Sequence, residues 1–435
     1  MPNILIKNAT LPSGSKSDIL ISGEQIVAVG TNVAGEPAAE GASEIDATGL
    51  VALPGFVDLH THLREPGFEQ SETILTGSQS AAAGGFTAVH AMANTWPVQD
   101  TAGVVEQVRA LGLAAGYVDV VPVGAVTVGL DGKQLAELNA MASSKARVRV
   151  FSDDGKCVHD PVLMRRALEY VKAFDGVVAQ HAQEPRLTEG AQMNEGKVSA
   201  ELGLTGWPAV AEESIIARDV LLAEHVGSRV HICHLSTAGS VEIVRWAKSR
   251  GINVTAEVTP HHLLLTDELA RSYDAVYKVN PPLRTHEDVL ALRAALVDGT
   301  IDIIATDHAP HPIEAKDCEW QAAAFGMLGL EIAASVAQEV LVESGLASWE
   351  RVAQVLSQNP ARIGRLEQQG QEIAAGSIAN LVLIDPAAKR VIETSHSKSQ
   401  NNPYSGLTLP GSVVHTIYRG YQTVTNGQLA SEGRI

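Results

Sequence analysis

The feature that most constrains the fold is a repeated alternation of short apolar runs and helical segments. Eight runs rich in β-branched residues span 56–59, 86–90, 117–123, 148–151, 177–179, 229–233, 253–258 and 301–305. Segments with the apolar spacing of amphipathic helices lie between most of them, as at 161–173, 212–225 and 240–250. Eight such strand–helix units predict an α/β fold, a (β/α)8 TIM-type barrel. An open doubly wound sheet is the alternative, but no G-x-G-x-x-G motif follows the first strand.

Both ends of the chain have a different pattern, of short strands separated by turns. The first part contains Ile4-Leu5-Ile6, Ile19-Leu20-Ile21 and Ile26-Val27-Ala28-Val29, and the last part contains β-rich runs at 379–384, 413–418 and 422–425. Asn426-Gly427 is a common hairpin turn pair. We therefore expect a small β-sandwich domain built from residues 1–54 and 366–435, beside a catalytic barrel of residues 55–365.

Composition narrows the possible partners. The net charge of −18 argues against a nucleic acid or an anionic membrane, both of which favour a basic surface. No apolar stretch approaches the roughly 20 residues of a membrane span, and no secretory signal is evident at the N-terminus. Cys157, Cys233 and Cys318 form no CxxC pair, so reduced structural cysteines are expected. We expect a cytoplasmic protein.

Polar residues able to bind metals follow several of the predicted strands. The C-terminal ends of barrel strands form the active-site face. The first strand ends in Asp-Leu-His-Thr-His, and on an extended chain His60 and His62 project to the same side, where both imidazoles reach one metal. The fourth strand runs into Ser-Asp-Asp-Gly at 152–155, which is either a turn or the source of a carboxylate that bridges two metals. The fifth strand ends at His181.

The sixth and eighth strands add further candidates. The sixth ends in Val-His-Ile-Cys-His, where alternation places His234 on the face opposite His231 and Cys233. If His234 points into the barrel mouth, the other two face the surrounding helices, so we exclude them as ligands. The eighth strand leads directly into Asp307, and His311 lies one short turn beyond.

Four histidines and two carboxylates at strand ends predict a binuclear metal site. Nitrogen and oxygen ligands without a thiolate suit Zn²⁺ in a catalytic role better than Mn²⁺, Co²⁺ or Fe²⁺. We expect two zinc ions per subunit.

Two longer motifs resemble the dihydroorotase branch of the amidohydrolase superfamily. They are Pro-Gly-Phe-Val-Asp-Leu-His-Thr-His-Leu-Arg-Glu-Pro-Gly at 54–67 and Ala-Thr-Asp-His-Ala-Pro-His at 305–311. The similarity covers essentially the whole chain, including the β-rich ends. It implies one metal held by His60, His62 and Asp307, and a second metal held by His181 and His234.

The resemblance also bears on the group that bridges the two metals. In hydantoinases, allantoinases and some dihydroorotases the bridge is a carboxylated lysine on strand four, but residues 148–152 contain no lysine. Bacterial dihydroorotases with an aspartate bridge have Asp-Asp-Gly here, with a spacing to the next ligand that fits Asp154 better than Asp153. The implied ligand set is therefore His60, His62, Asp154, His181, His234 and Asp307.

The activity implied by the resemblance is reversible hydrolysis of L-dihydroorotate to N-carbamoyl-L-aspartate, a step of pyrimidine biosynthesis. Asp307 would be the catalytic group that moves the proton, and Arg64 would hold the substrate carboxylate through a bidentate pair. Further substrate contacts are expected from His62, Asn94, Asn280, His311 and the backbone of Phe325 and Gly326.

Two alternatives remain at this point. A hydrolase of another cyclic amide, such as a dihydropyrimidine, hydantoin or allantoin, would favour a strand-four lysine. A non-catalytic barrel that only scaffolds aspartate transcarbamoylase would have lost its ligands, whereas this chain has the full set. A homodimer and an association with that transcarbamoylase are both compatible with the sequence. The charged residues Glu314, Lys316, Asp317 and Glu319 indicate a solvent-exposed, mobile loop at 312–324.

Overall fold

The computed structural model describes residues 3–393 and 395–434, and its centre is a barrel of eight parallel strands. One series contains β6 (Phe56–Thr61), β7 (Phe86–Ala91) and β8 (Asp119–Pro122), and the other contains β9 (Val150–Phe151), β10 (Val177–Gln180), β13 (Val230–Ile232), β14 (Val254–Val258) and β15 (Ile303–Ile304). Bridges between Gly124 and Phe151 and between Thr61 and His308 join the two series on both sides. The predicted barrel is confirmed.

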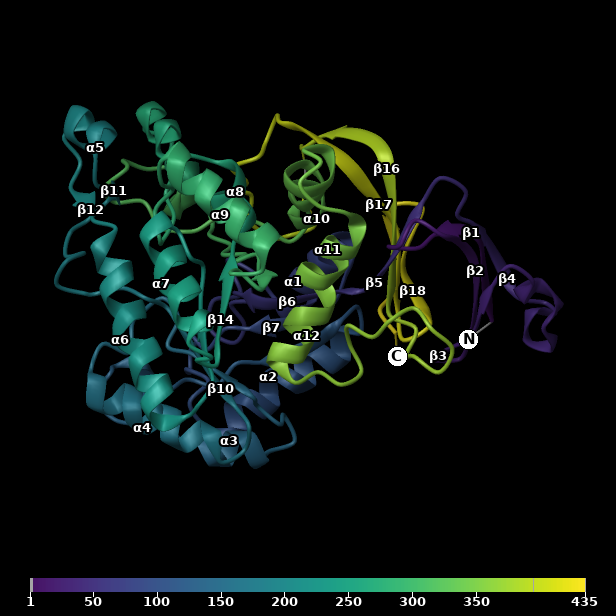
Figure 1. The fold of residues 1–435 in the computed structure, drawn as a ribbon, viewed down its shortest axis with the longest axis horizontal. Coiled ribbons are helices and arrows are strands. Elements are labelled where there is room, and N and C mark those ends of the chain that lie inside the picture. Colours follow the sequence, from purple (N-terminus) through teal and green to yellow (C-terminus); the bar gives the residue numbers. More distant parts are fainter. Residues whose placement is uncertain (1–2, 394, 435) are drawn as a thin grey trace.

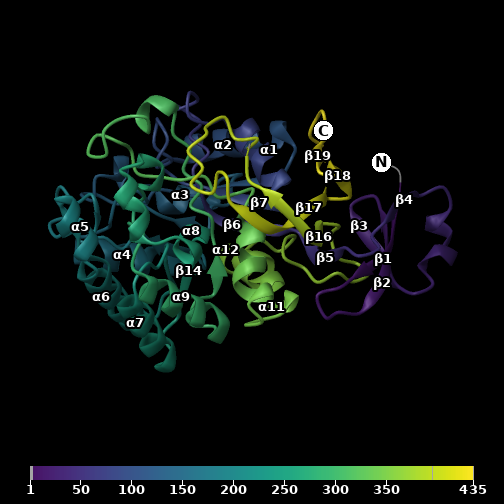
Figure 2. The same ribbon diagram turned by 90° about the horizontal axis from the view of Figure 1, so that it is seen from above.

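Helices surround the strands on the outside (Figures 1 and 2). Those that follow the first seven strands are α1 (Ile74–Ala83), α2 (Ala102–Ala115), α3 (Leu138–Ser143), α4 (Pro161–Lys172), α6 (Val210–Val226), α7 (Ala238–Ser249) and α9 (His286–Asp298). After β15 come α10 (Ala333–Ala337), α11 (Trp349–Ala353) and α12 (Asn359–Gly364), with the helical turns η7 (Gln338–Glu343) and η8 (Gln354–Gln358) between them. Shorter elements on the mouth side are β11 (Met193–Asn194), α5 (Lys197–Leu202), β12 (Gly206–Trp207) and α8 (Pro260–Leu264).

Local sequence explains where a typical helix begins and which face it buries. In α4 the side chain of Asp160 accepts hydrogen bonds from the backbone N–H groups of Val162 and Leu163, and a proline occupies the first helical position. Met164, Leu168 and Val171 are buried at helical spacing. The cap and the apolar stripe together orient the helix against the barrel.

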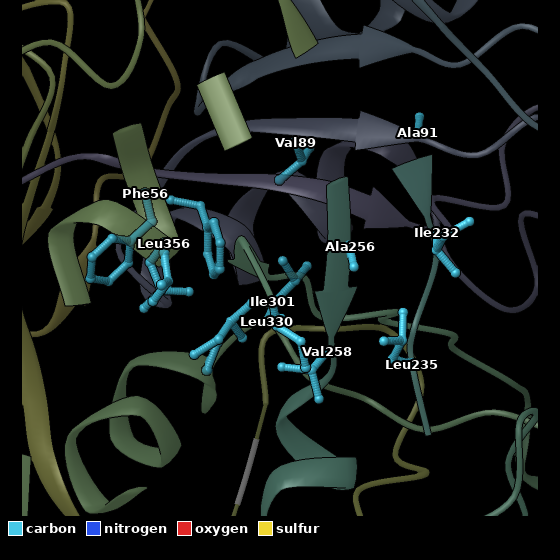
Figure 3. Close-up of a cluster of buried hydrophobic side chains, with 14 of the residues drawn as sticks. Phe56, Val89, Ala91, Ile232, Leu235, Ala256, Val258, Ile301, Leu330 and Leu356 are labelled. Atoms are coloured by element: carbon cyan, nitrogen blue, oxygen red, sulfur yellow. The ribbon is translucent and has the colours of Figure 1, made fainter. Parts of the chain in front are cut away.

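Apolar side chains pack on both sides of the barrel strands, against the helices outside and within the barrel inside. The larger cluster packs outward-facing strand residues against the helices; Figure 3 shows part of it, with Ile232, Ala256 and Val258 among the strand side chains. A smaller cluster containing Val177, Ala179 and Cys233 fills the barrel interior. The interior is therefore packed and closed below the strand ends, which leaves the C-terminal mouth as the place for a site.

The two ends of the chain form one nine-stranded sheet beside the barrel. Its strands are β1 (Ile4–Thr10), β2 (Lys16–Ser22), β3 (Gln25–Gly30), β4 (Ser43–Asp46), β5 (Val51–Pro54), β16 (Leu381–Val391), β17 (Thr408–Tyr418), β18 (Tyr421–Thr425) and β19 (Gln428–Leu429). Strands from both ends share a buried cluster, as expected for a β sandwich. Asn426 and Gly427, with φ of 50° and 73°, turn β18 into β19 as predicted.

No helix in the described part of the chain is long and apolar enough to cross a membrane.

Candidate metal centre

All six predicted metal ligands meet at the barrel mouth. One group of possible ligand atoms comes from His60, His62, Asp154 and Asp307, and a second comes from Asp154, His181 and His234. In each group the atoms lie within 4.8 Å of one another, and every residue is buried. The residues come from chain segments that follow β9, β10, β13 and β15, together with the end of β6, so the barrel fold assembles them.

Asp154 belongs to both groups and directs a different oxygen toward each. Its Oδ2 lies 3.3 Å from both His60 Nε2 and His62 Nε2. Its Oδ1 lies 3.0 Å from His181 Nδ1 and 3.3 Å from His234 Nε2. A carboxylate shared in this way has the arrangement of a bridge between two cations. The neighbouring Asp153 is differently placed, because it accepts hydrogen bonds from Val126 and Thr127.

Asp307 completes the first group. Its Oδ1 lies 3.1 Å from His62 Nε2 and 3.4 Å from His60 Nε2. Both Asp307 and His234 follow the last residues of their strands and have positive φ values, 45° and 32°. Left-handed backbone is rare outside glycine and asparagine, and here it turns each side chain into the mouth at the point where the strand pairing ends.

The same turn overturns one prediction about strand six. We expected His231 and Cys233 to face the helices, but Cys233 lies in the barrel-interior cluster and His231 Nε2 lies 2.9 Å from Glu257. The strict alternation assumed in the sequence ends with β13 at Ile232, and the positive φ of His234 re-aims that side chain. His231 and His234 therefore both lie on the inner side of the barrel.

Glu257 on β14 is a candidate site residue that sequence reasoning missed. Its carboxylate accepts a hydrogen bond of 2.6 Å from His60 Nδ1, and its other oxygen pairs with His231. Carboxylates behind metal-binding histidines fix the ring orientation and the tautomer, which leaves the opposite nitrogen for the metal. The available signal was a lone acid within the apolar strand Val-Thr-Ala-Glu-Val.

Neutral side chains hold two of the other histidines. His62 Nδ1 lies 2.9 Å from the amide oxygen of Asn94, and His181 Nε2 lies 2.8 Å from Gln183 Oε1. Each bond is made by the ring nitrogen that points away from the carboxylates, so the facing nitrogen carries the lone pair that a metal needs. Asn94, predicted as a substrate contact, thus also positions a candidate ligand.

The electrostatics of the cluster fit a cation. Burial lowers the pKa of His60, but the charges of Asp154 and Asp307 outweigh burial and raise that pKa well above its ordinary value. Burial raises the pKa of Asp154, but the charge of His60 and hydrogen bonds from His181 and other histidines hold it well below its ordinary value. The acids stay ionised in a site where an unpaired charge is costly.

An unsatisfied atom supports the same reading. His60 Nε2 is buried and has no hydrogen-bond partner among the described residues, although it faces two carboxylates at 3.3 and 3.4 Å. A divalent cation between these groups would satisfy the nitrogen and the acids together, because metal ligands are neutral histidines and ionised carboxylates. The residues present therefore fit one or two divalent metal ions.

The predicted substrate residues surround this cluster. Arg64 donates from Nε to Pro310 O at 3.1 Å, and its terminal nitrogen lies 3.4 Å from His311 Nε2. In the described chain its guanidinium has no carboxylate partner, and burial lowers its pKa to about 10. Asn280 donates to Gln183 at 3.2 Å and keeps its buried Oδ1 unpaired. A cation and an acceptor are thus available to a ligand.

The Phe325–Gly326 backbone is largely engaged already. Phe325 O lies 2.8 Å from His311 Nε2, and Gly326 N donates to Lys278 O at 3.0 Å. Gly326 O accepts from Lys316 and Asn401. Within residues 3–393 and 395–434 the Phe325 N–H alone among these backbone groups has no hydrogen-bond partner, so the predicted substrate contact at this position narrows to that N–H.

The predicted exposure of the 312–324 loop is wrong at Lys316. Glu314, Asp317 and Glu319 are exposed, whereas Lys316 is only 8% exposed and donates three hydrogen bonds. Composition could not separate them, because a long lysine stem can cross a loop and place its amine beneath it.

Known proteins are similar to this chain over nearly its whole length. Residues 49–240 match the family described as dihydro-orotase-like. The dihydroorotase of Leifsonia xyli subsp. xyli is 68% identical, over 97% of this chain and 96% of its own. The dihydroorotase of Mycobacterium tuberculosis is 54% identical, over 96% of each. The chain belongs to the dihydroorotase family.

Solved structures place this dihydroorotase-family chain within a wider group of cyclic-amide hydrolases. The L-hydantoinase (dihydropyrimidinase) from Arthrobacter aurescens superimposes with a TM-score of 0.87 at 26% identity, over 99% of this chain and 98% of its own. The dihydropyrimidinase from Brevibacillus agri gives a TM-score of 0.84 at 25% identity. The barrel with its β sandwich is thus common to the group.

Proposed function

We propose that the chain is a dihydroorotase that hydrolyses L-dihydroorotate reversibly to N-carbamoyl-L-aspartate, with two zinc ions per subunit. The observation that carries the proposal is the buried His–Asp cluster with Arg64 beside it. The cluster offers a cyclic amide its metal ligands, and the guanidinium without a carboxylate partner offers the substrate carboxylate an ion pair. This reaction belongs to pyrimidine biosynthesis.

The metal ions would be held in two half-sites that share Asp154. His60, His62 and Asp307 would complete the first, and His181 and His234 would complete the second. When bound, the ions supply a nucleophilic hydroxide near neutral pH and polarise the ring carbonyl. The protein aims the lone pairs, through Glu257, Asn94 and Gln183 behind the histidines.

Asp307 would move the proton. Its Oδ1 lies 3.1 Å from His62 Nε2 and 3.4 Å from His60 Nε2, and as an ionised carboxylate it would accept the proton of the attacking hydroxide. The same carboxyl group then delivers this proton to the leaving ring nitrogen. In the condensation direction the transfers run in reverse.

Arg64, Asn280 and the Phe325 N–H would bind and orient the substrate. The guanidinium would pair with the carboxylate, the unpaired Asn280 Oδ1 would accept a ring N–H, and the backbone N–H would donate to a ring carbonyl. The ring would thus be fixed from several sides, which places its scissile carbonyl over the metal cluster.

A hydrolase of another cyclic amide is the second candidate, favoured by the likeness to hydantoinase structures. Two features oppose it: the bridge position carries Asp154 instead of a lysine, and Arg64 would face a substrate that lacks a carboxylate.

The test compares ring opening of dihydroorotate with that of dihydrouracil, which lacks the carboxylate, in the wild type and in Arg64→Met. We expect the wild type to prefer dihydroorotate strongly and to lose activity on chelation, with recovery on zinc addition. In Arg64→Met the preference should collapse through a higher KM for dihydroorotate alone. Equal use of both compounds by the wild type would favour the second candidate.

Several finer expectations stay predictions. They are the zinc identity, a homodimer, an association with aspartate transcarbamoylase, a cytoplasmic location and the division into residues 1–54 with 366–435 and residues 55–365. Metal analysis and sedimentation of the purified chain, alone and with the transcarbamoylase, address the first three.

A further inference from the structure

Two buried lysines tie the loop between His311 and Phe325 to the barrel. Lys316 Nζ donates to the carbonyl oxygens of Lys278, Ala324 and Gly326 at 3.0, 2.8 and 3.0 Å. Lys278 Nζ donates in the opposite direction, to Trp320 O at 2.7 Å and Gln321 O at 3.2 Å. The loop and the segment that carries Asn280 therefore hold each other through amine–carbonyl bonds.

The environment of Lys316 is unusual for a buried amine. Its three partners are backbone carbonyls, and in the described chain it has no carboxylate partner. Only the ammonium form has three N–H donors, so the geometry requires the charged form. Burial opposes this and lowers the pKa of Lys316 to about 7. A buried charge is costly unless hydrogen bonds compensate it, and here the three carbonyl oxygens provide that compensation.

The carbonyls that Lys316 holds adjoin the substrate residues. Gly326 O belongs to the predicted substrate-contact segment, and Lys278 O also accepts the N–H of Gly326 at 3.0 Å. Lys278 lies two residues before Asn280, the residue with the unpaired Oδ1. One ammonium group thus joins two chain segments that would contact opposite parts of a ligand.

The fit around Gly326 leaves little freedom. Gly326 has a φ of 146°, and a Cβ at this position would lie 2.8 Å from both Ala309 Cβ and His311 Nε2. Asn401 donates to Gly326 O and to Ala309 O, at 3.1 and 2.9 Å. The backbone at Gly326 is thus packed closely against the residues of the mouth. Lys316 also holds Ala324 O, which shares a peptide group with the Phe325 N–H, so loss of the amine would change the direction of that N–H.

We propose that Lys316 is a positioning residue for substrate binding, whose ammonium group holds the backbone of residues 324–326 and the Asn280 segment in register. It does not touch the reacting atoms. The inference rests on the proposed function, since it assigns Lys316 to the binding of the same substrate. Loss of the amine should therefore weaken dihydroorotate binding and leave the metal chemistry intact.

The first test is a KM-against-kcat comparison of Lys316→Met, with Glu319→Gln as the control. Glu319 lies in the same loop and is exposed. We expect Lys316→Met to raise KM about tenfold, since a preorganised binding segment becomes mobile. Its kcat should stay within about twofold of wild type, and its zinc content should be unchanged. Glu319→Gln should match the wild type.

The second test is chemical rescue of Lys316→Ala. A hollow of about 240 Å³ is lined in part by His311, Ile313 and Lys316, and truncation of Lys316 to alanine would extend it toward the three carbonyl oxygens as a route for a small cation. Ethylammonium has three N–H donors and should lower the raised KM toward the wild-type value. Tetramethylammonium carries the same charge without an N–H donor, so it should have no effect.

Two outcomes would overturn the proposal: a KM unchanged in Lys316→Met, or a rescue equal for both cations. Failure of both variants to fold would also overturn it, because Lys316 would then serve stability. Hydrogen exchange of residues 313–326 tests the positioning role without an activity assay. It therefore distinguishes a failure of this proposal from a failure of the proposed function. If the wild type does not open dihydroorotate, faster exchange in Lys316→Met, slowed by ethylammonium in Lys316→Ala, still supports the positioning role.

Discussion

The two halves of the candidate metal centre differ in charge. The first half-site has Asp307 as a carboxylate of its own, and behind His60 stands the ionised Glu257. Among the described residues the second half-site has no carboxylate besides the shared Asp154, and behind His181 stands the neutral Gln183. Anionic partners raise the basicity of a histidine ligand and favour a dication directly. We therefore expect the first half-site to bind its metal more tightly.

Buried carboxyl groups hold the backbone of ligand residues in both halves. Next to the first half-site, Asp58 on β6 accepts hydrogen bonds from the backbone N–H of His60 and from Thr306, the residue before Asp307. This buried carboxyl joins strands one and eight at the ligands. At the second half-site, Glu257 Oε1 accepts a hydrogen bond of 3.2 Å from the backbone N–H of His234, so Glu257 supports ligands of both halves. His234 and Asp307 both take left-handed backbone after short strands, so the two halves differ in charge and not in this backbone support.

Removal of Asp154, the carboxylate shared by both half-sites, should have the largest effect on metal content and turnover. In Asp154→Ala both half-sites lose a carboxylate oxygen, so we expect loss of both metals and a fall in turnover well beyond the roughly 100-fold upper range for an outer partner. Metal content by elemental analysis and the rate of ring opening measure this. Asp153→Asn is the matched control, since Asp153 bonds Thr127 and not the cluster. Normal zinc content in Asp154→Ala would contradict the bridging assignment.

The next effect separates catalysis from binding. In Asp307→Asn the proton acceptor is lost while an amide oxygen remains, so turnover should fall by about 10² to 10⁴. Metal should be retained in the second half-site, and part of the metal in the first. Titration with zinc alongside activity measures both. Turnover near the wild-type rate would remove Asp307 from its assigned role.

Glu257→Gln should make the residue behind His60 neutral, like Gln183 behind His181, and so test whether charge sets the difference in metal affinity between the half-sites. The substitution keeps an oxygen for His60 Nδ1–H but removes the negative charge, so zinc affinity of the first half-site should fall about 10- to 100-fold. Competition against a chelator reports the tighter of the two binding steps. A tighter step that does not change would mean that the first half-site is not the stronger one.

The reciprocal substitution is Gln183→Glu. A carboxylate behind His181 should raise the zinc affinity of the second half-site, by up to about tenfold, and bring the two steps closer together. Thr188, which now accepts from Gln183, has a hydroxyl that can donate to the new carboxylate. Weaker zinc binding in Gln183→Glu would show that the charge behind His181 does not determine which half-site binds zinc more tightly.

The comparison also explains what could be predicted from the sequence. The barrel strands and the ligands at their ends were predicted, because β-branched runs and the His-x-His pair are local patterns. Glu257 was missed because its partner His60 lies 197 residues away in the chain. The side assigned to His231 was wrong because alternation fails where a residue takes a positive φ, which no local pattern marked at His234. Contacts between side chains on different barrel strands can be identified only once the fold is known.

The remaining expected effect concerns the stability of the fold near the second half-site. Asp219 on α6 is buried and accepts hydrogen bonds of 2.8 Å from Gln180, the residue before His181, and from Arg218. Burial raises its pKa to about 6, although the charge of Arg218 and these hydrogen bonds oppose the rise. Between pH 4 and 6 the folded chain therefore binds more protons than the unfolded chain, and this group's contribution to stability falls as pH rises.

Replacement of Asp219 by Asn should remove that dependence. The unfolding free energy of the wild type, compared with that of Asp219→Asn, should decline across pH 4 to 6 by on the order of 2 kcal/mol and stay level above. Denaturant unfolding at a series of pH values measures the difference. If the unfolding free energies of the two proteins change with pH in parallel, Asp219 is charged in both the folded and the unfolded state. Gln180, the residue before His181, would then be held by an ionised carboxylate, and the difference in charge between the half-sites would be smaller.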